Sequence, residues 1–102
     1  MENLSVSDGS TLRIDLSGTL TVNDHSKFRA MIQSEECAGK SLLILNMAKV
    51  EFIDSAGMGM LLFASKASQS ATWSLRILNP TGQVQKMIEL AKLDKMLDVA
   101  YS

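Results

Sequence analysis

The residues best suited to chemistry lie in one short segment, Asp54-Ser55-Ala56-Gly57-Met58-Gly59, at a predicted junction between a strand and a helix. A Ser or Asp side chain at a helix start can cap the helix by accepting hydrogen bonds from free backbone amides. A hydroxyl in that place is also exposed and close to the positive end of the helix dipole, which tolerates an added phosphate. The phosphate would add about −1.5 to −2 charges beside Asp54 and bury an anion in any complementary partner surface. The segment therefore predicts either a plain helix cap or a phosphorylation switch at Ser55.

Two glycines bracket Met58 in the first turns of this helix. Each Gly in a helix costs about 1 kcal/mol relative to Ala, so some other interaction must offset the cost. Close packing of the helix on a sheet accounts for at least one of Gly57 and Gly59, and close approach of a partner's backbone is the alternative. The run from Met58 to Ala64 is apolar on nearly all sides, so Met58 is either an exposed docking anchor or part of a thicker core.

The sequence argues against catalysis at Ser55. A nucleophile elbow needs Gly two residues before the Ser, where this chain has Ile53, and the only histidine, His25, precedes Ser55 and has no local sign of pairing with it. One His and Cys37 cannot supply the four ligands of a zinc site. The glycine pair lacks the Lys and the spacing of a P-loop. We therefore expect no enzyme activity, no catalytic residue, no metal and no cofactor.

The composition is that of an ordinary globular chain of 102 residues with a net charge of −1. No basic block is present, which argues against direct binding to nucleic acid or to an anionic membrane. Cys37 has no partner for an internal disulfide, no signal-peptide pattern is visible, and the most apolar segment is far shorter than the ~20 residues that span a bilayer. We expect one cytoplasmic domain over residues 1–102.

Strand and helix patterns alternate along the first half of the chain. Alternating apolar residues predict two strands over 4–7 and 12–17, joined by a tight turn at Asp8-Gly9. Helical spacing of Phe28, Met31 and Ile32 predicts a first helix, with Asn23 or Asp24 as its cap and Gly39 as its stop.

The second half repeats this alternation. The apolar run Leu42–Leu45 predicts a central strand covered on both faces, and a second helix follows over 58–67. Residues 75–78 form another short strand, Asn79-Pro80 opens a third helix with Asn as cap, and alternation over 97–101 predicts a final edge strand. The order predicts an α/β fold with a mostly parallel sheet, whose right-handed crossovers bring the helix starts, and with them Ser55, to one edge.

The segment from Val50 to Leu62 resembles the signature of STAS domains, the family of bacterial anti-sigma factor antagonists. The resemblance covers nearly the whole chain: Leu16–Leu20 is similar to the family's Gly-x-Leu after the second strand, Leu43–Asn46 to its central strand, and Leu75–Pro80 to its fourth strand and helix start. Gln85–Leu97 resembles the last helix and its exit. The resemblance implies the STAS fold, a mixed and mostly parallel sheet of about five strands with about three or four helices and an N-terminal hairpin.

What the resemblance implies about function is partner switching without catalysis. Ser55 occupies the position that a partner serine kinase with a histidine-kinase-like ATPase fold phosphorylates and a metal-dependent phosphatase restores. The unphosphorylated form binds the kinase or anti-sigma factor and frees a sigma factor or another regulator of transcription, and the phosphorylated form lets go. The family's partner-binding surface maps onto the loop after the second strand and the start of the second helix: Thr21, Asn23, Asp24, Asp54, Ala56, Gly57, Met58, Gly59 and Met60.

This chain departs from the family pattern at two positions. Thr21 stands where the family often has an Asp that contacts the partner, and Asn46 stands where the central strand often ends in Asp. Some STAS domains have no phosphorylation cycle and serve as scaffolds or as small subunits of larger complexes such as transporters. That role is the alternative to the switch.

Overall fold

A single mixed sheet forms the base of the molecule in the computed structural model, which describes residues 1–101. Its strand order follows the chain: β1 (Glu2–Asp8), β2 (Thr11–Leu20), β3 (Leu42–Ile53), β4 (Ser74–Leu78) and β5 (Val99–Ala100). β1 pairs with β2 in antiparallel fashion, and every later neighbour is parallel. The predicted α/β fold, with its N-terminal hairpin and its mostly parallel sheet centred on β3, is confirmed.

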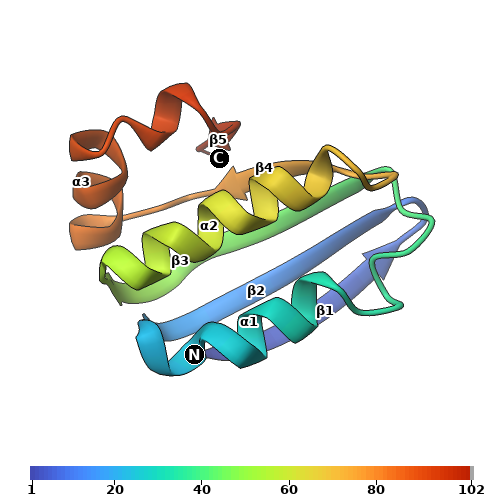
Figure 1. The fold of residues 1–102 in the computed structure, drawn as a ribbon, viewed down its shortest axis with the longest axis horizontal. Coiled ribbons are helices and arrows are strands. Elements are labelled where there is room, and N and C mark those ends of the chain that lie inside the picture. The colour runs from blue at the N-terminus through green and yellow to red at the C-terminus, as the bar shows by residue number, and fades with distance from the viewer. Residues whose placement is uncertain (102) are drawn as a thin grey trace.

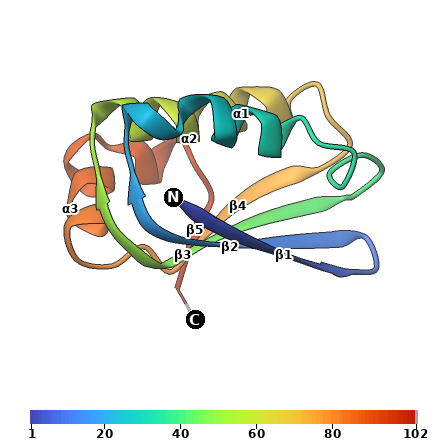
Figure 2. The same cartoon turned by 90° about the horizontal axis from the view of Figure 1, so that it is seen from below.

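Three α-helices and two short 3-10 helices connect the strands: η1 (Val22–Asp24), α1 (His25–Ile32), α2 (Ser55–Ser68), α3 (Gly82–Leu90) and η2 (Leu93–Lys95). Helices α1 and α2 lie side by side over one face of the sheet, as Figure 1 and Figure 2 show. Helix α3 lies at the end of the molecule where β2 and β3 finish. The starts of α1, α2 and α3 therefore meet at the carboxyl edge of the parallel strands, as the right-handed crossovers predict.

Alternating side chains of the strands bury one face of the sheet under the helices. Both central strands follow this period of two, which is the pattern read from the sequence for β2. The prediction that β3 is covered on both faces is therefore wrong: Leu43 and Leu45 are buried under the helices, whereas Leu42 and Ile44 on the other face are only half-buried. The fully buried side chains of these two strands and of the two covering helices include Leu12, Ile14, Leu16, Leu43, Leu45, Met47, Phe28 and Leu61. One continuous apolar core thus fixes the helix that carries Ser55.

Several predicted element boundaries are wrong. β3 continues to Ile53 instead of ending at Leu45, because it keeps its pairing with β2 through two register shifts, although four of its last six side chains are exposed. Helix α1 ends at Ile32, well before Gly39, and turns follow it. The last strand keeps only two residues.

The start of α3 also differs from the prediction. The helix begins at Gly82 with Thr81 in the N-cap position, not with Asn79 as cap. Asn79 has φ +55°, a left-handed conformation, whereas an N-cap residue takes an extended one. The chain therefore turns at Asn79-Pro80 before the helix begins.

The turns after α1 bury the lone cysteine. Cys37 is 2% exposed, and its thiol lies 3.6 Å from the Met31 carbonyl oxygen and 3.8 Å from the Ser34 hydroxyl. Burial raises the pKa of the Cys37 thiol above its usual value.

Candidate functional site

Asp54 and Ser55 have different roles at the start of α2. Asp54 has extended backbone, and its Oδ1 accepts the Gly57 N–H at 2.8 Å, so Asp54 is the helix cap. Ser55 is the first helical residue and is exposed. Within residues 1–101, the Ser55 hydroxyl makes no hydrogen bond to the chain. Asp54 alone therefore caps α2, and the hydroxyl of Ser55 takes no part in the cap.

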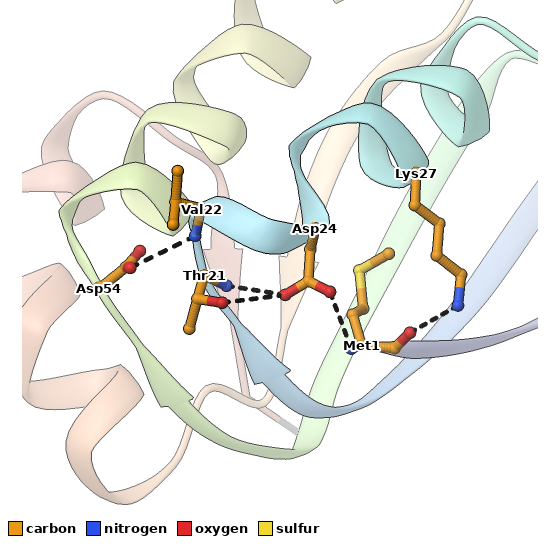
Figure 3. A network of polar contacts seen from close by, with 6 residues as sticks. All are labelled: Met1, Thr21, Val22, Asp24, Lys27 and Asp54. Atoms are coloured by element: carbon orange, nitrogen blue, oxygen red, sulfur yellow. Dashed lines mark hydrogen bonds and ion pairs between the residues drawn. The ribbon is translucent and has the colours of Figure 1, made fainter.

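The same carboxylate ties α2 to the loop after β2. Its second oxygen, Oδ2, accepts the Val22 N–H at 3.4 Å, as drawn in Figure 3. One side chain thus contacts both segments that the sequence assigned to partner binding. The loop and the helix start form one continuous surface around Ser55.

Asp24 stabilises that loop from within. Its carboxylate accepts the Thr21 N–H at 2.9 Å and lies 3.0 Å from the Met1 ammonium, while the Lys27 Nζ donates to the Met1 carbonyl at 2.7 Å (Figure 3). Burial alone would raise the pKa of Asp24, but the hydrogen bond from Thr21 and the nearby ammonium outweigh it and lower this pKa. Of the two predicted caps of α1, Asp24 and not Asn23 stands at the N-cap position, but its side chain makes no capping hydrogen bond to the helix.

The two glycines of α2 have different surroundings. A Cβ on Gly57 would collide with the Leu20 carbonyl oxygen and would lie 2.6 Å from the Cγ1 of Ile53. A Cβ on Gly59 would meet nothing within 4 Å. Close packing on the sheet therefore explains Gly57, which is buried and is removed from the predicted partner surface, and it does not explain Gly59.

The methionines of this turn also differ. Met58 is half-buried and packs against the core, whereas Met60 is only 2% exposed. A side chain buried to that degree offers almost no surface to a partner. We therefore remove Met60 from the predicted partner surface and assign it to the core, while Ala56, which is half-buried, stays at the margin of that surface.

Two exposed apolar residues at this edge lie in the predicted segments but were not among the predicted partner-binding residues. Val22 is 63% exposed beside Asp54, and Phe52 is 44% exposed two residues before it. Val22 gave a usable signal, since it is a lone apolar residue in a polar stretch. Phe52 gave none, because the register shifts between β2 and β3 upset the alternation that would have marked it as outward-facing. We call Val22, Asn23, Phe52, Ser55, Met58 and Gly59 together the Ser55 surface.

Neither a metal site nor a membrane span is visible in the part of the chain that the structure describes. Its His, Cys, Asp and Glu residues form no group of three that could hold a metal ion. Within residues 1–101, no helix has the length and apolar character needed to cross a bilayer.

Comparison with known families decides the class of this fold. A family model described as "Mlab, STAS domain" matches residues 5–98. The chain belongs to the STAS domain family. A search of the curated proteins found no match to it.

Solved structures with the same fold include proteins of different roles. An anti-sigma factor antagonist from Mycobacterium paratuberculosis is 17% identical, with a TM-score of 0.85 over 97% of this chain and 84% of that one. The Bacillus cell fate determinant SpoIIAA in its phosphorylated form is 22% identical, with a TM-score of 0.71 over 97% and 91%. A sulfate transporter family protein from Wolinella succinogenes is 16% identical, with a TM-score of 0.78 over 93% and 80%. These STAS structures share the fold with our chain.

Proposed function

We propose that this STAS protein is a regulatory binding protein of the anti-sigma factor antagonist type, controlled by phosphorylation of Ser55. In its unphosphorylated state it binds a serine kinase that acts as an anti-sigma factor, or a similar regulator, in the cytoplasm. Phosphorylation of Ser55 releases the partner, and a metal-dependent serine phosphatase restores binding. The protein itself performs no catalysis and needs no cofactor.

The observation that carries this proposal is the division of labour between Asp54 and Ser55. Because Asp54 caps α2, the Ser55 hydroxyl is exposed and unused in the fold. A phosphate on it would stand beside the free amides of the first helical turn, so the fold would tolerate it. At a docked interface the same phosphate would lie next to the Asp54 carboxylate as an additional, desolvated anion, which opposes binding.

The Ser55 surface has the chemistry of a contact with another protein. Val22, whose N–H donates to Asp54, and Phe52, two residues before Asp54, offer exposed apolar area, and Gly59 leaves room for a close approach of the partner's backbone. The chain as a whole carries a charge of only −1, so it has no strong overall field to steer a charged partner. We infer that shape and apolar contacts bind the partner, and that the negative charge of a phosphate on Ser55 releases it.

The first test is the intact mass of the protein isolated from its native cells, with and without phosphatase treatment. We expect an additional mass of about 80 Da, one phosphate group, that fragment mapping places on Ser55. Ser55→Ala should abolish this mass, and the matched exposed control Ser70→Ala should keep it. A mass shift that persists in Ser55→Ala would contradict the assignment of the site.

The second test is retention of the partner. Ser55→Ala should hold the co-isolated kinase as wild type does, whereas Ser55→Asp should weaken binding tenfold or more, about 1.4 kcal/mol, through the added charge. The affinity of purified partners, measured by calorimetry, checks this. Equal binding by both variants would rule out the switch.

A second candidate function is that of a permanent subunit in a larger complex such as a transporter. The exposed apolar pair Val22 and Phe52 favours it, because a lasting contact would also cover them, and the fold is shared with a sulfate transporter family protein. Stable co-purification that Ser55→Asp does not disturb, together with no phosphate on Ser55, would support this function over the switch.

A further inference from the structure

One side chain of α3 holds the last residue of β3. The Ile53 N–H donates to the Oε1 of Gln83 at 2.9 Å, and the Nε2 of Gln83 donates to the Ile53 carbonyl at 2.9 Å. The amide of Gln83 thus satisfies both backbone groups of Ile53, as a neighbouring strand would. Both distances are typical of strong N–H···O hydrogen bonds.

The end of β3 needs these hydrogen bonds because β3 extends further than the neighbouring strand β4. β4 pairs with β3 only from Leu42 to Asn46, whereas β2 pairs with β3 as far as Ile53. Along its last residues, the side of β3 that faces away from β2 is therefore covered by α3 instead of a strand. A buried backbone group without a partner costs about 1 to 3 kcal/mol, which Gln83 avoids at Ile53.

The bond to the Ile53 carbonyl acts directly on the start of the switch segment. The Ile53 carbonyl and the Asp54 N–H belong to one planar peptide unit. Gln83 holds the oxygen of this unit, and the Leu20 carbonyl accepts its N–H at 3.3 Å. This peptide unit is thus hydrogen-bonded at both its oxygen and its N–H. Its orientation helps to fix the extended backbone of Asp54, and that backbone places the Asp54 cap and Ser55 at the start of α2.

We propose that Gln83 is a positioning residue that couples α3 to Ser55. This inference rests on the proposed function for its consequence, because it adds a second input to the same site. Any partner or variant that displaces α3 loosens the Ile53–Asp54 peptide and changes how Ser55 is presented to the kinase. The Ser55 surface is then regulated from a helix that is not part of it.

The test uses two replacements at this position and two matched controls on the same helix. Gln83→Met removes both hydrogen bonds at nearly constant size. Gln83→Glu keeps the shape, but an ionised carboxylate cannot donate and faces the Ile53 carbonyl with an acceptor, whereas the protonated acid regains a donor. Gln85→Met and Gln85→Glu make the same changes of size and charge two residues further on.

The first readout is the set of backbone amide resonances of residues 53–57 in the full chain, recorded by NMR over a range of pH. Gln83→Met should shift them at every pH. Gln83→Glu should shift them near neutral pH and return them to the wild-type positions, at matched pH, once the introduced carboxyl is protonated, below about pH 4. The Gln85 variants should match wild type throughout.

A merely structural role would lower the stability to urea without this pH-dependent rescue of five particular amides. If folded Gln83 variants leave these resonances unchanged, the proposal is overturned. Should both variants fail to fold, Gln83→Asn provides the milder test, because it keeps both polar groups one methylene short of Ile53.

The second readout separates this inference from the proposed function. The phosphorylated fraction of Ser55 in native cells, from intact mass, should fall at least threefold in Gln83→Met and stay unchanged in Gln85→Met. Equal phosphorylation of wild type and Gln83→Met would overturn the coupling alone. Absence of phosphate from Ser55 in wild type would instead overturn the proposed function, and with it the regulatory role of Gln83, while the NMR comparison still decides whether Gln83 sets the backbone at Asp54.

Discussion

The inward and outward sides of the first two turns of α2 obey different constraints. On the inward side, the Asp54 carboxylate, Gly57 and Met60 are each explained by a contact within the chain. On the outward side, the hydroxyl of Ser55 and the missing side chain of Gly59 serve nothing in the fold. The proposed partner contact would account for a costly Gly and a free hydroxyl on this side of the helix.

The largest effect should come from Gly57→Ala. Its Cβ would collide with backbone, the carbonyl oxygen of Leu20, which cannot move without disturbing the end of β2. We expect a loss of about 3 kcal/mol in the free energy of unfolding, the upper range for overpacking, measured by urea denaturation. A loss below about 0.5 kcal/mol would contradict the close packing assigned to this side.

Asp54→Ala should have the next largest effect. It removes the cap of α2 and the contact with the Val22 N–H together, for a loss of about 1 to 2 kcal/mol in the free energy of unfolding. Asp54→Asn is the matched control, because Asn caps helices about as well as Asp, and it should retain most of the stability. Ser55→Ala should change stability by less than about 0.5 kcal/mol. A larger loss for Ser55→Ala than for Asp54→Ala would reverse the assigned roles.

Gly59→Ala should separate stability from binding. The new methyl group meets open space, so the helix should gain up to about 1 kcal/mol in the free energy of unfolding. The same methyl group stands where we place the partner's backbone, so the affinity for the partner should fall. Thermal melts and calorimetry on one preparation check both. A stabilised variant with undiminished affinity would move the docking contact away from Gly59.

Asp24→Asn should give the smallest effect, visible only in acid. Because the pKa of Asp24 is lower in the folded protein than in the unfolded chain, its contribution is present above the unfolded value near pH 4 and is lost as the pH falls through the folded pKa. The variant lacks this group and should lose less stability than wild type between pH 4 and its acid unfolding. Urea titrations at a series of pH values measure both slopes, and parallel slopes would show that the loop does not depend on this charge.

The elements of the fold that depend on local pattern were predictable. The hairpin around Asp8-Gly9, the central strand and the second helix follow from alternation, apolar runs and helical spacing, and the signature around Ser55 indicated the family. The choice between Ser55 and Asp54 as helix cap was not predictable, because both residues suit the position and only the geometry separates them.

What could not be predicted depends on residues distant in sequence. Gln83 bonds to Ile53 across 30 positions, and no local pattern on α3 indicates it. Likewise, the exposure of Phe52 results from register shifts between β2 and β3. Each of these features depends on contacts between different helices and strands, and the spacing of residues within one helix or strand does not predict such contacts.

The buried thiol of Cys37, in the turns after α1, can report local opening of those turns. Burial raises the pKa of the Cys37 thiol and so disfavours the thiolate, which is the nucleophile that reacts with alkylating reagents. Its labelling should therefore proceed only through transient exposure of the turns that enclose it. Because the sequence has a single cysteine, the rate at which the intact mass rises with alkylation measures this opening, and no engineered probe is needed.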